Sequence, residues 1–231
     1  MNLSHHEVQK DTRKRRHYRL LLLGMFGILT AIVFFSFWIG YYPLSPSQVM
    51  TAFLSRFGYQ GELLPQAVTI FWNIRLPRIL SALFIGASLS VAGSAYQGMF
   101  RNPMVSPDIL GASTGAGFGA ALAILLGAGY FGISLSAFCF GLLAVAAAWL
   151  VSRLSRSDPT VALILAGMMI SSLFSAGTSF IKLVADTQQQ LPAITYWLMG
   201  SLSSIKAEDV RFLVLPVAVG LLPLFLLRWR M

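Results

Sequence analysis

Apolar residues occur in long runs that short polar segments separate. A helix that crosses a bilayer needs about 20 predominantly apolar residues. The runs that reach or approach this length cover residues 20–42, 79–100, 109–127, 130–150, 160–184 and 210–227. The pattern predicts an all-α fold, a polytopic transmembrane helical bundle of about six spans.

Small residues recur at four-residue spacing in two of these runs. They are Gly86, Ser90 and Ser94 in the second run, and Gly111, Gly115 and Gly119 in the third. Such stripes let helix backbones approach closely and pack by van der Waals contact. We therefore expect Gly86, Gly111, Gly115 and Gly119 to be helix-packing residues.

The fifth run carries polar side chains on one helix face, namely Ser171, Ser175, Thr178 and Lys182. A polar face in a buried helix either lines a solute pathway or only donates hydrogen bonds to a neighbouring helix, and both interpretations stay open. In the following loop, 185–209, Pro192 suits the first turn of a short helix. Gly200 is its expected end.

Composition supports a membrane environment. Of the 231 residues, 56% are hydrophobic and only 11% are charged, with a mean hydropathy of +0.72. Soluble domains carry about a quarter charged residues. A chain with so few charges cannot cover a water-facing surface, so the bilayer is its natural solvent.

The net charge is +9, and six of the 17 basic residues cluster at the N-terminus. Before residue 20 lie Lys10, Arg13, Lys14, Arg15, Arg16 and Arg19. This pattern predicts a basic cytoplasmic tail over 1–19, able to contact anionic membrane lipid, followed by a transmembrane domain over 20–231. No folded basic domain surrounds the cluster, so we expect no nucleic-acid partner.

Basic residues also predict the orientation. With the N-terminus inside, 11 of the 17 basic residues face the cytoplasm and 6 face outward. The positive-inside rule therefore places both termini in the cytoplasm, 43–76 and 185–209 outside, and 101–108 and 153–159 inside. The outward set is Arg56, Arg75, Arg78, Lys182, Lys206 and Arg211.

The sequence offers little chemistry of its own. No ionisable residue lies deep in any predicted span, although ion-coupled transporters usually keep such groups at membrane depth. Cys139 stands alone, the pair His5-His6 is expected to be disordered, and no phosphate-binding loop or catalytic triad is present. We expect no enzyme activity, catalytic residue, metal site or cofactor. If the protein moves a solute, the energy must come from another subunit.

The stretch 75–119 carries an ordered set of motifs. It contains Arg75-Leu76-Pro77-Arg78 at the start of the second span, Gly86-Ala87-Ser88-Leu89, Gly93, Gln97-Gly98, Arg101-Asn102-Pro103, Pro107 and Leu110-Gly111. Leu165-Ala166-Gly167 and Tyr196-Trp197-Leu198-Met199-Gly200 follow later. Over residues 19–231 the chain resembles permeases of the FecCD family. We expect Pro77 to begin a span and Asp108 to cap the next one.

The resemblance implies a function. FecCD permeases import iron–siderophores, haem, cobalamin and some oxyanions across the bacterial cytoplasmic membrane, together with an ABC ATPase, an extracytoplasmic substrate-binding protein and a second permease chain. It implies that Arg75 and Arg78 dock acidic residues of the binding protein. It also implies that Thr160 lies at a cytoplasmic gate near the two-fold axis, although Asp158-Pro159-Thr160 is equally a plain helix start.

Family members have about ten spans, and their coupling helices begin where this chain ends, at Arg228-Trp229-Arg230-Met231. We expect the sequence to lack the C-terminal part of the family fold. Two other hypotheses stay open, a stand-alone secondary carrier and a truncated, non-transporting membrane protein. The reading frame after codon 231 would separate a fragment from a natural truncation.

Overall fold

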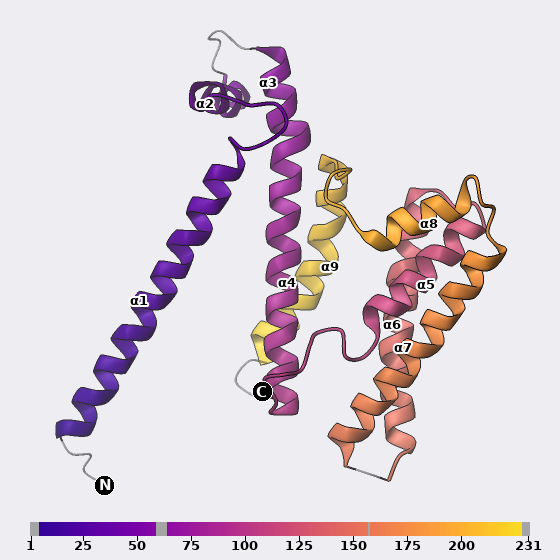
Figure 1. The fold of residues 1–231 in the computed structure, drawn as a ribbon. Helices are drawn as coiled ribbons and strands as arrows, with labels where there is room; N and C mark the ends of the chain where they lie inside the picture. The colour runs from indigo at the N-terminus through magenta and orange to yellow at the C-terminus, as the bar shows by residue number, and fades with distance from the viewer. Residues whose placement is uncertain (1–4, 59–63, 157, 228–231) are drawn as a thin grey trace. The chain divides into compact units, whose positions relative to one another are not determined.

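The computed structural model describes residues 5–58, 64–156 and 158–227, with side chains from residue 16 onward. The secondary structure in these ranges is helical (Figure 1). Along the chain it comprises α1 (His5–Ser36), α2 (Pro46–Leu54), the 3₁₀ turn η1 (Ser55–Phe57), α3 (Pro65–Thr69), the π-helical segment η2 (Ile70–Arg75), α4 (Leu76–Phe100), α5 (Ala112–Leu125), α6 (Tyr130–Leu154), α7 (Pro159–Val184), α8 (Gln190–Met199) and α9 (Ala207–Leu227).

Five described helical segments are long and apolar enough to cross a membrane. They are Arg16–Ser36, Pro65–Phe100, Tyr130–Leu154, Pro159–Val184 and Ala207–Leu226, and Ala112–Leu125 is a shorter apolar helix. The expected all-α, polytopic transmembrane fold is therefore confirmed.

The third predicted span is shorter than expected. Helix α5 has 14 residues, or about 21 Å at 1.5 Å per residue, against a hydrocarbon core of about 30 Å. Gly111 precedes the helix with a φ of 78°, and Gly127 follows it with a φ of 71°. Both are left-handed conformations that glycine adopts at little cost, and they stop the helix at each end.

Capping predictions near α5 and α8 are confirmed. The Asp108 carboxylate accepts a hydrogen bond from the Ser113 N–H at 2.9 Å, which satisfies a first-turn amide of α5. The expected short helix is α8, which has Pro192 in its first turn and ends at Gly200 with a φ of 70°. It begins two residues before Pro192, at Gln190.

The N-terminal segment differs from expectation. Helix α1 begins at His5 and continues without a break through the basic residues into the apolar run. The expected disorder of His5-His6 is therefore wrong, because this segment extends the helix of the first span. Side chains of residues 5–15 lie outside the description, as do Arg228, Trp229 and Arg230.

The second predicted span begins earlier than expected. The helix runs from Pro65 to Phe100, so Pro77 lies inside it rather than at its start. In η2 the backbone widens, and the N–H of Leu76 donates to the carbonyl of Phe71, five residues back. Proline has no N–H and its ring crowds the preceding turn, and a π-helical turn is one way a helix accommodates such a break.

The chain divides into two compact units. Unit 1 comprises Met1–Phe84 with Ser203–Leu215, and unit 2 comprises Ile85–Leu202 with Pro216–Met231. In unit 1, α2 lies against α3 and η2 (Figure 1). Phe71, only 3% exposed, stacks on Phe37 and lies edge-on to Phe53. The Trp72 indole donates to the carbonyl of Ala52 at 2.8 Å.

In unit 2, α5, α6 and α7 pack side by side, and α8 packs on α5 (Figure 1). Ala121, Ile181, Ala185 and Ile194 form a buried core there, where Ile194 anchors α8. Small side chains bring these helices close together. A Cβ on Gly115 would lie 2.6 Å from the Ala144 Cβ, and one on Gly119 would lie 2.6 Å from the Ser136 carbonyl oxygen.

The two other glycines expected to pack behave differently. Gly111 is not on a helix face, since it is the residue before α5, and a Cβ there would lie 2.6 Å from the Ser171 hydroxyl. Around Gly86, no described heavy atom outside the nearby backbone of its own helix lies within 4 Å of a Cβ position. The Ser90 and Ser94 hydroxyls donate to carbonyls of their own helix. A helix-packing role for Gly86 stays a prediction.

Candidate functional site

The arginine pair of the Arg-Leu-Pro-Arg motif lies where η2 passes into α4. The helix Pro65–Phe100 has 36 residues, or about 54 Å, much longer than a bilayer core of about 30 Å. If the roughly 20 residues that end at Phe100 span the hydrocarbon core of the bilayer, Arg75 and Arg78 lie at the membrane interface. Their position on the outer side of the membrane stays a prediction.

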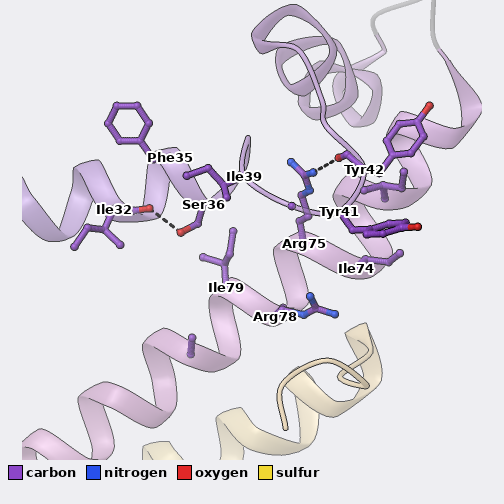
Figure 2. A pocket seen from close by; sticks show the side chains of 13 residues that line it. Ile32, Phe35, Ser36, Ile39, Tyr41, Tyr42, Ile74, Arg75, Arg78 and Ile79 are labelled. Atoms are coloured by element: carbon purple, nitrogen blue, oxygen red, sulfur yellow. Dashed lines mark hydrogen bonds between the residues drawn. The ribbon is translucent and has the colours of Figure 1, made fainter.

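Arg75 points inward. Its side chain is only 8% exposed, and its two terminal nitrogens donate to the backbone carbonyls of Phe37 and Tyr42. Figure 2 shows the guanidinium directed at Tyr42. The two acceptors lie in the connection between α1 and α2, so Arg75 ties that connection to the helix.

Close approach at Arg75 depends on Gly40. A Cβ on this residue would lie 2.9 Å from one terminal nitrogen of Arg75, so any side chain there would displace the guanidinium. This contact could not be predicted, because Gly40 and Arg75 are 35 positions apart and neither belongs to a periodic pattern.

Arg78 has a different environment. Its side chain is half-buried, and it donates to the Ser203 carbonyl at 2.7 Å, in the segment that precedes α9. In Figure 2 it extends in another direction from Arg75. The two arginines of the Arg-Leu-Pro-Arg motif therefore hold two different connections rather than forming one exposed pair.

A cavity of about 790 Å³ opens beside these arginines (Figure 2). Its walls come from the end of α1, the connection from Ile39 to Tyr42, and the helix between Ile70 and Ala82. Most of the lining is aliphatic or aromatic, with the two guanidinium groups as its charged members. Its volume lies in the range of small-molecule pockets, about 300–1,000 Å³.

The predicted inner gate begins α7. The Asp158 carboxylate accepts hydrogen bonds from the N–H groups of Thr160 and Val161, at 2.9 and 3.2 Å, and Pro159 is the first helical residue. This is the plain helix start that the sequence also allowed. A gate role for Thr160 stays a prediction.

The predicted pathway residues on α7 are not equivalent. Ser171 is half-buried and lies against Gly111. Thr178 donates to the Phe174 carbonyl of its own helix at 2.9 Å, and Ser175 is exposed. Only Ser175 therefore faces open space in the described structure, and the pathway role of all three stays a prediction.

The helices define a multi-pass α-helical membrane protein. The chain belongs to the FecCD transport family, whose model matches residues 28–231. It is 36% identical to MolB, the molybdate import system permease protein of Haemophilus influenzae, over 93% of this chain and 63% of that protein.

Other relatives are named for different cargoes. A Helicobacter pylori protein described as a probable iron chelatin transport system permease is 39% identical, over 74% of this chain and 51% of the relative. The cobalamin import permease BtuC of Halobacterium salinarum is 38% identical, over 67% of this chain and 42% of that protein.

One solved structure, described as an inward-facing metal-chelate type ABC transporter, matches with a TM-score of 0.77 at 36% identity. The match covers 92% of this chain and 63% of that one. The chain thus spans less than two thirds of the length of these relatives.

Proposed function

We propose that this chain acts as the permease subunit of an ATP-driven importer that moves an iron–siderophore or related metal chelate across the bacterial cytoplasmic membrane. The observation that carries the proposal is the fold match at a TM-score of 0.77 to a metal-chelate type ABC transporter, at 36% identity. Relatives named for molybdate, iron chelatin and cobalamin support the broad cargo class.

The partners follow from this function. An ABC ATPase would supply the energy, an extracytoplasmic binding protein would deliver the chelate, and a second permease chain would complete the pathway. The uncharged spans support this division of labour, because ion-coupled carriers usually keep ionisable groups at membrane depth. Among the described residues, no cluster of His, Cys, Asp and Glu could hold a metal ion.

Transport by the assembled complex tests the proposal. Proteoliposomes that contain the permease, its ATPase and its binding protein should accumulate a radiolabelled ferric siderophore only with ATP. Unlabelled cobalamin and molybdate, added in separate arms, would identify the cargo. Equal uptake without ATP would instead indicate a secondary carrier.

For orientation, we propose a cytoplasmic N-terminus. In a Cys139→Ser background, a cysteine at Tyr41, whose side chain is fully exposed, should react with an impermeant maleimide in intact cells. A cysteine at Leu154, which is 80% exposed, should react only after the cells are opened. The reverse pattern would refute the orientation.

For docking, we propose that acidic residues of the binding protein bind at the surface around this arginine pair, with Arg78 as the direct contact. Guanidinium groups hold carboxylates bidentately and stay charged. In the assembled transporter, Arg78→Glu should weaken docking at least about 10-fold, because truncating one partner of a buried charge pair costs about 2–5 kcal/mol. Arg56→Glu, at an exposed outer arginine, is the matched control.

For the gate, we propose that Thr160 of two permease chains meet near the two-fold axis. Engineered cysteines at residue 160 should then crosslink in at least one nucleotide state, and their failure to crosslink in every state would remove the assignment.

A further inference from the structure

The guanidinium of Arg75 binds backbone rather than an acidic side chain. Its acceptors, the Phe37 and Tyr42 carbonyls, lie on both sides of Gly40. Among the described residues, no carboxylate pairs with Arg75, so its charge is held by carbonyl dipoles alone. With an exposed fraction of 8%, this side chain offers little surface to another protein.

We propose that Arg75 is a positioning residue that clasps the segment 37–42 onto η2 and so sets the shape of the outer docking surface without touching the partner. The clasp itself concerns this chain alone. Its consequence for docking rests on the proposed function.

The clasp uses the shape of the side chain, not only its charge. Carbonyls beyond the last turn of a helix have no partner within the helix, and Phe37 follows directly after α1. Arginine presents several N–H donors in a planar fork, which can reach two carbonyls at once. Lysine keeps the charge but concentrates it on one flexible ammonium group, so it should hold the segment less firmly.

The clasped segment has an outward face. Ile39 is 76% exposed and the Tyr41 side chain is fully exposed. The segment and Arg78 line the same cavity. If the segment moves, the surroundings of Arg78 change although Arg78 itself is intact. Arg75 can therefore influence docking through position.

Hydrogen–deuterium exchange on the 231-residue chain in lipid nanodiscs tests the clasp directly. The readout is exchange of the amides of residues 37–42, which include the N–H groups of Phe37, Trp38 and Ile39 that bond to the end of α1. In Arg75→Lys these amides should exchange at least about 10-fold faster, the factor that 1.4 kcal/mol represents.

Gly40→Val tests the contact between Arg75 and the segment 37–42 by a substitution in the segment itself. It leaves Arg75 intact but places a Cβ 2.9 Å from the guanidinium nitrogen, so it should also speed exchange in 37–42. Gly129→Val is the matched control, because nothing lies within 4 Å there and its φ of −72° suits valine. Arg56→Lys is the control for an outer arginine.

Hydrogen–deuterium exchange in α5 and α6 reports whether each variant is folded. If Arg75→Lys fails to fold, exchange of residues 37–42 in Gly40→Val tests the clasp instead. Unchanged exchange of 37–42 in the folded variants would overturn the clasp. Faster exchange in the two test variants, with both controls unchanged, would support it.

Docking in the assembled transporter separates positioning from contact. A positioning role predicts that Arg75→Lys and Arg75→Gln weaken docking to a similar extent, at least about 10-fold, and that Gly40→Val weakens it as well. Normal docking in Arg75→Lys with loss in Arg75→Gln would assign Arg75 to direct charge contact and overturn the positioning role. If the wild-type permease does not dock, the proposed function fails while the exchange result still stands.

Discussion

Units 1 and 2 differ in how closely their helices approach, although aromatic rings pack in both, with Phe118, Phe140 and Phe174 grouped in unit 2. In unit 2 the helices meet where side chains are missing, as at Gly115 and Gly119, so backbone lies directly against the neighbouring helix. In unit 1, Phe71 and Trp72 pack on Phe53 of α2, and Arg75 binds two backbone carbonyls. Helix α1, in contrast, leaves most of its apolar side chains exposed.

The difference shows which features a sequence pattern can report. Close helix contact requires small residues at regular spacing, which the sequence displays. A side chain that binds backbone carbonyls far along the chain leaves no periodic trace. Arg75 and its Phe37 acceptor are 38 positions apart, and neither residue predicts the other.

The largest expected effect is in unit 1. Phe71→Ala should lower the free energy of unfolding by about 3–5 kcal/mol, because it removes a buried ring and leaves a cavity. The ring is 3% exposed and stacks on Phe37 with a centroid distance of 5.1 Å. Unfolding of the purified chain in detergent measures the loss.

Phe57→Ala is the control for Phe71→Ala, since its ring is 72% exposed. It should change stability by no more than about 0.5 kcal/mol. Equal effects of the two substitutions would mean that unit 1 is not ordered by its buried aromatic rings.

An intermediate effect is expected in unit 2. Gly115→Leu should destabilise the chain by about 1–3 kcal/mol, because overpacking forces backbone to move. A Cβ there would lie 2.6 Å from both the Ala144 Cβ and the Phe140 carbonyl oxygen. Gly86→Leu, with no described atom outside the nearby backbone of its own helix within 4 Å, should be neutral in the same unfolding assay. A cost at Gly86 as large as at Gly115 would remove the proposed difference between the two glycine stripes.

The smallest expected effect is the loss of a helix cap, because a cap depends on neighbouring residues and not on how the helices of unit 1 or unit 2 pack. Asp158→Ala should cost about 1 kcal/mol, since it removes the acceptor for two first-turn amides of α7. Asp158→Asn should retain most of the stability, because asparagine also caps well. Melting temperature in detergent compares the two variants. If alanine were tolerated as well as asparagine, the cap would contribute nothing.

Much of the fold could be predicted because it depends on local rules. Apolar runs predicted the helices, although α5 is shorter and the second span begins earlier than expected. Asp108 and Gly200 were predicted as helix boundaries, since capping involves residues only a few positions apart. The Arg-Leu-Pro-Arg motif could be found in the sequence, but the inward direction of Arg75 could not, because its acceptors lie 38 and 33 positions away. The docking role of both arginines stays a prediction.

By itself, the sequence determined that this protein is an all-α membrane protein, where most helices lie, and which residues begin and end several of them. Hydrophobic runs and helix caps involve residues that are close together in the chain, so both can be predicted from the sequence. Only the tertiary structure decided that η2 widens into a π-helical turn, that Gly111 precedes α5 instead of packing on its face, and that Arg75 turns inward. Each of these depends on atoms that are distant in the chain or on a backbone conformation that is settled when the helices pack, and no local pattern encodes them.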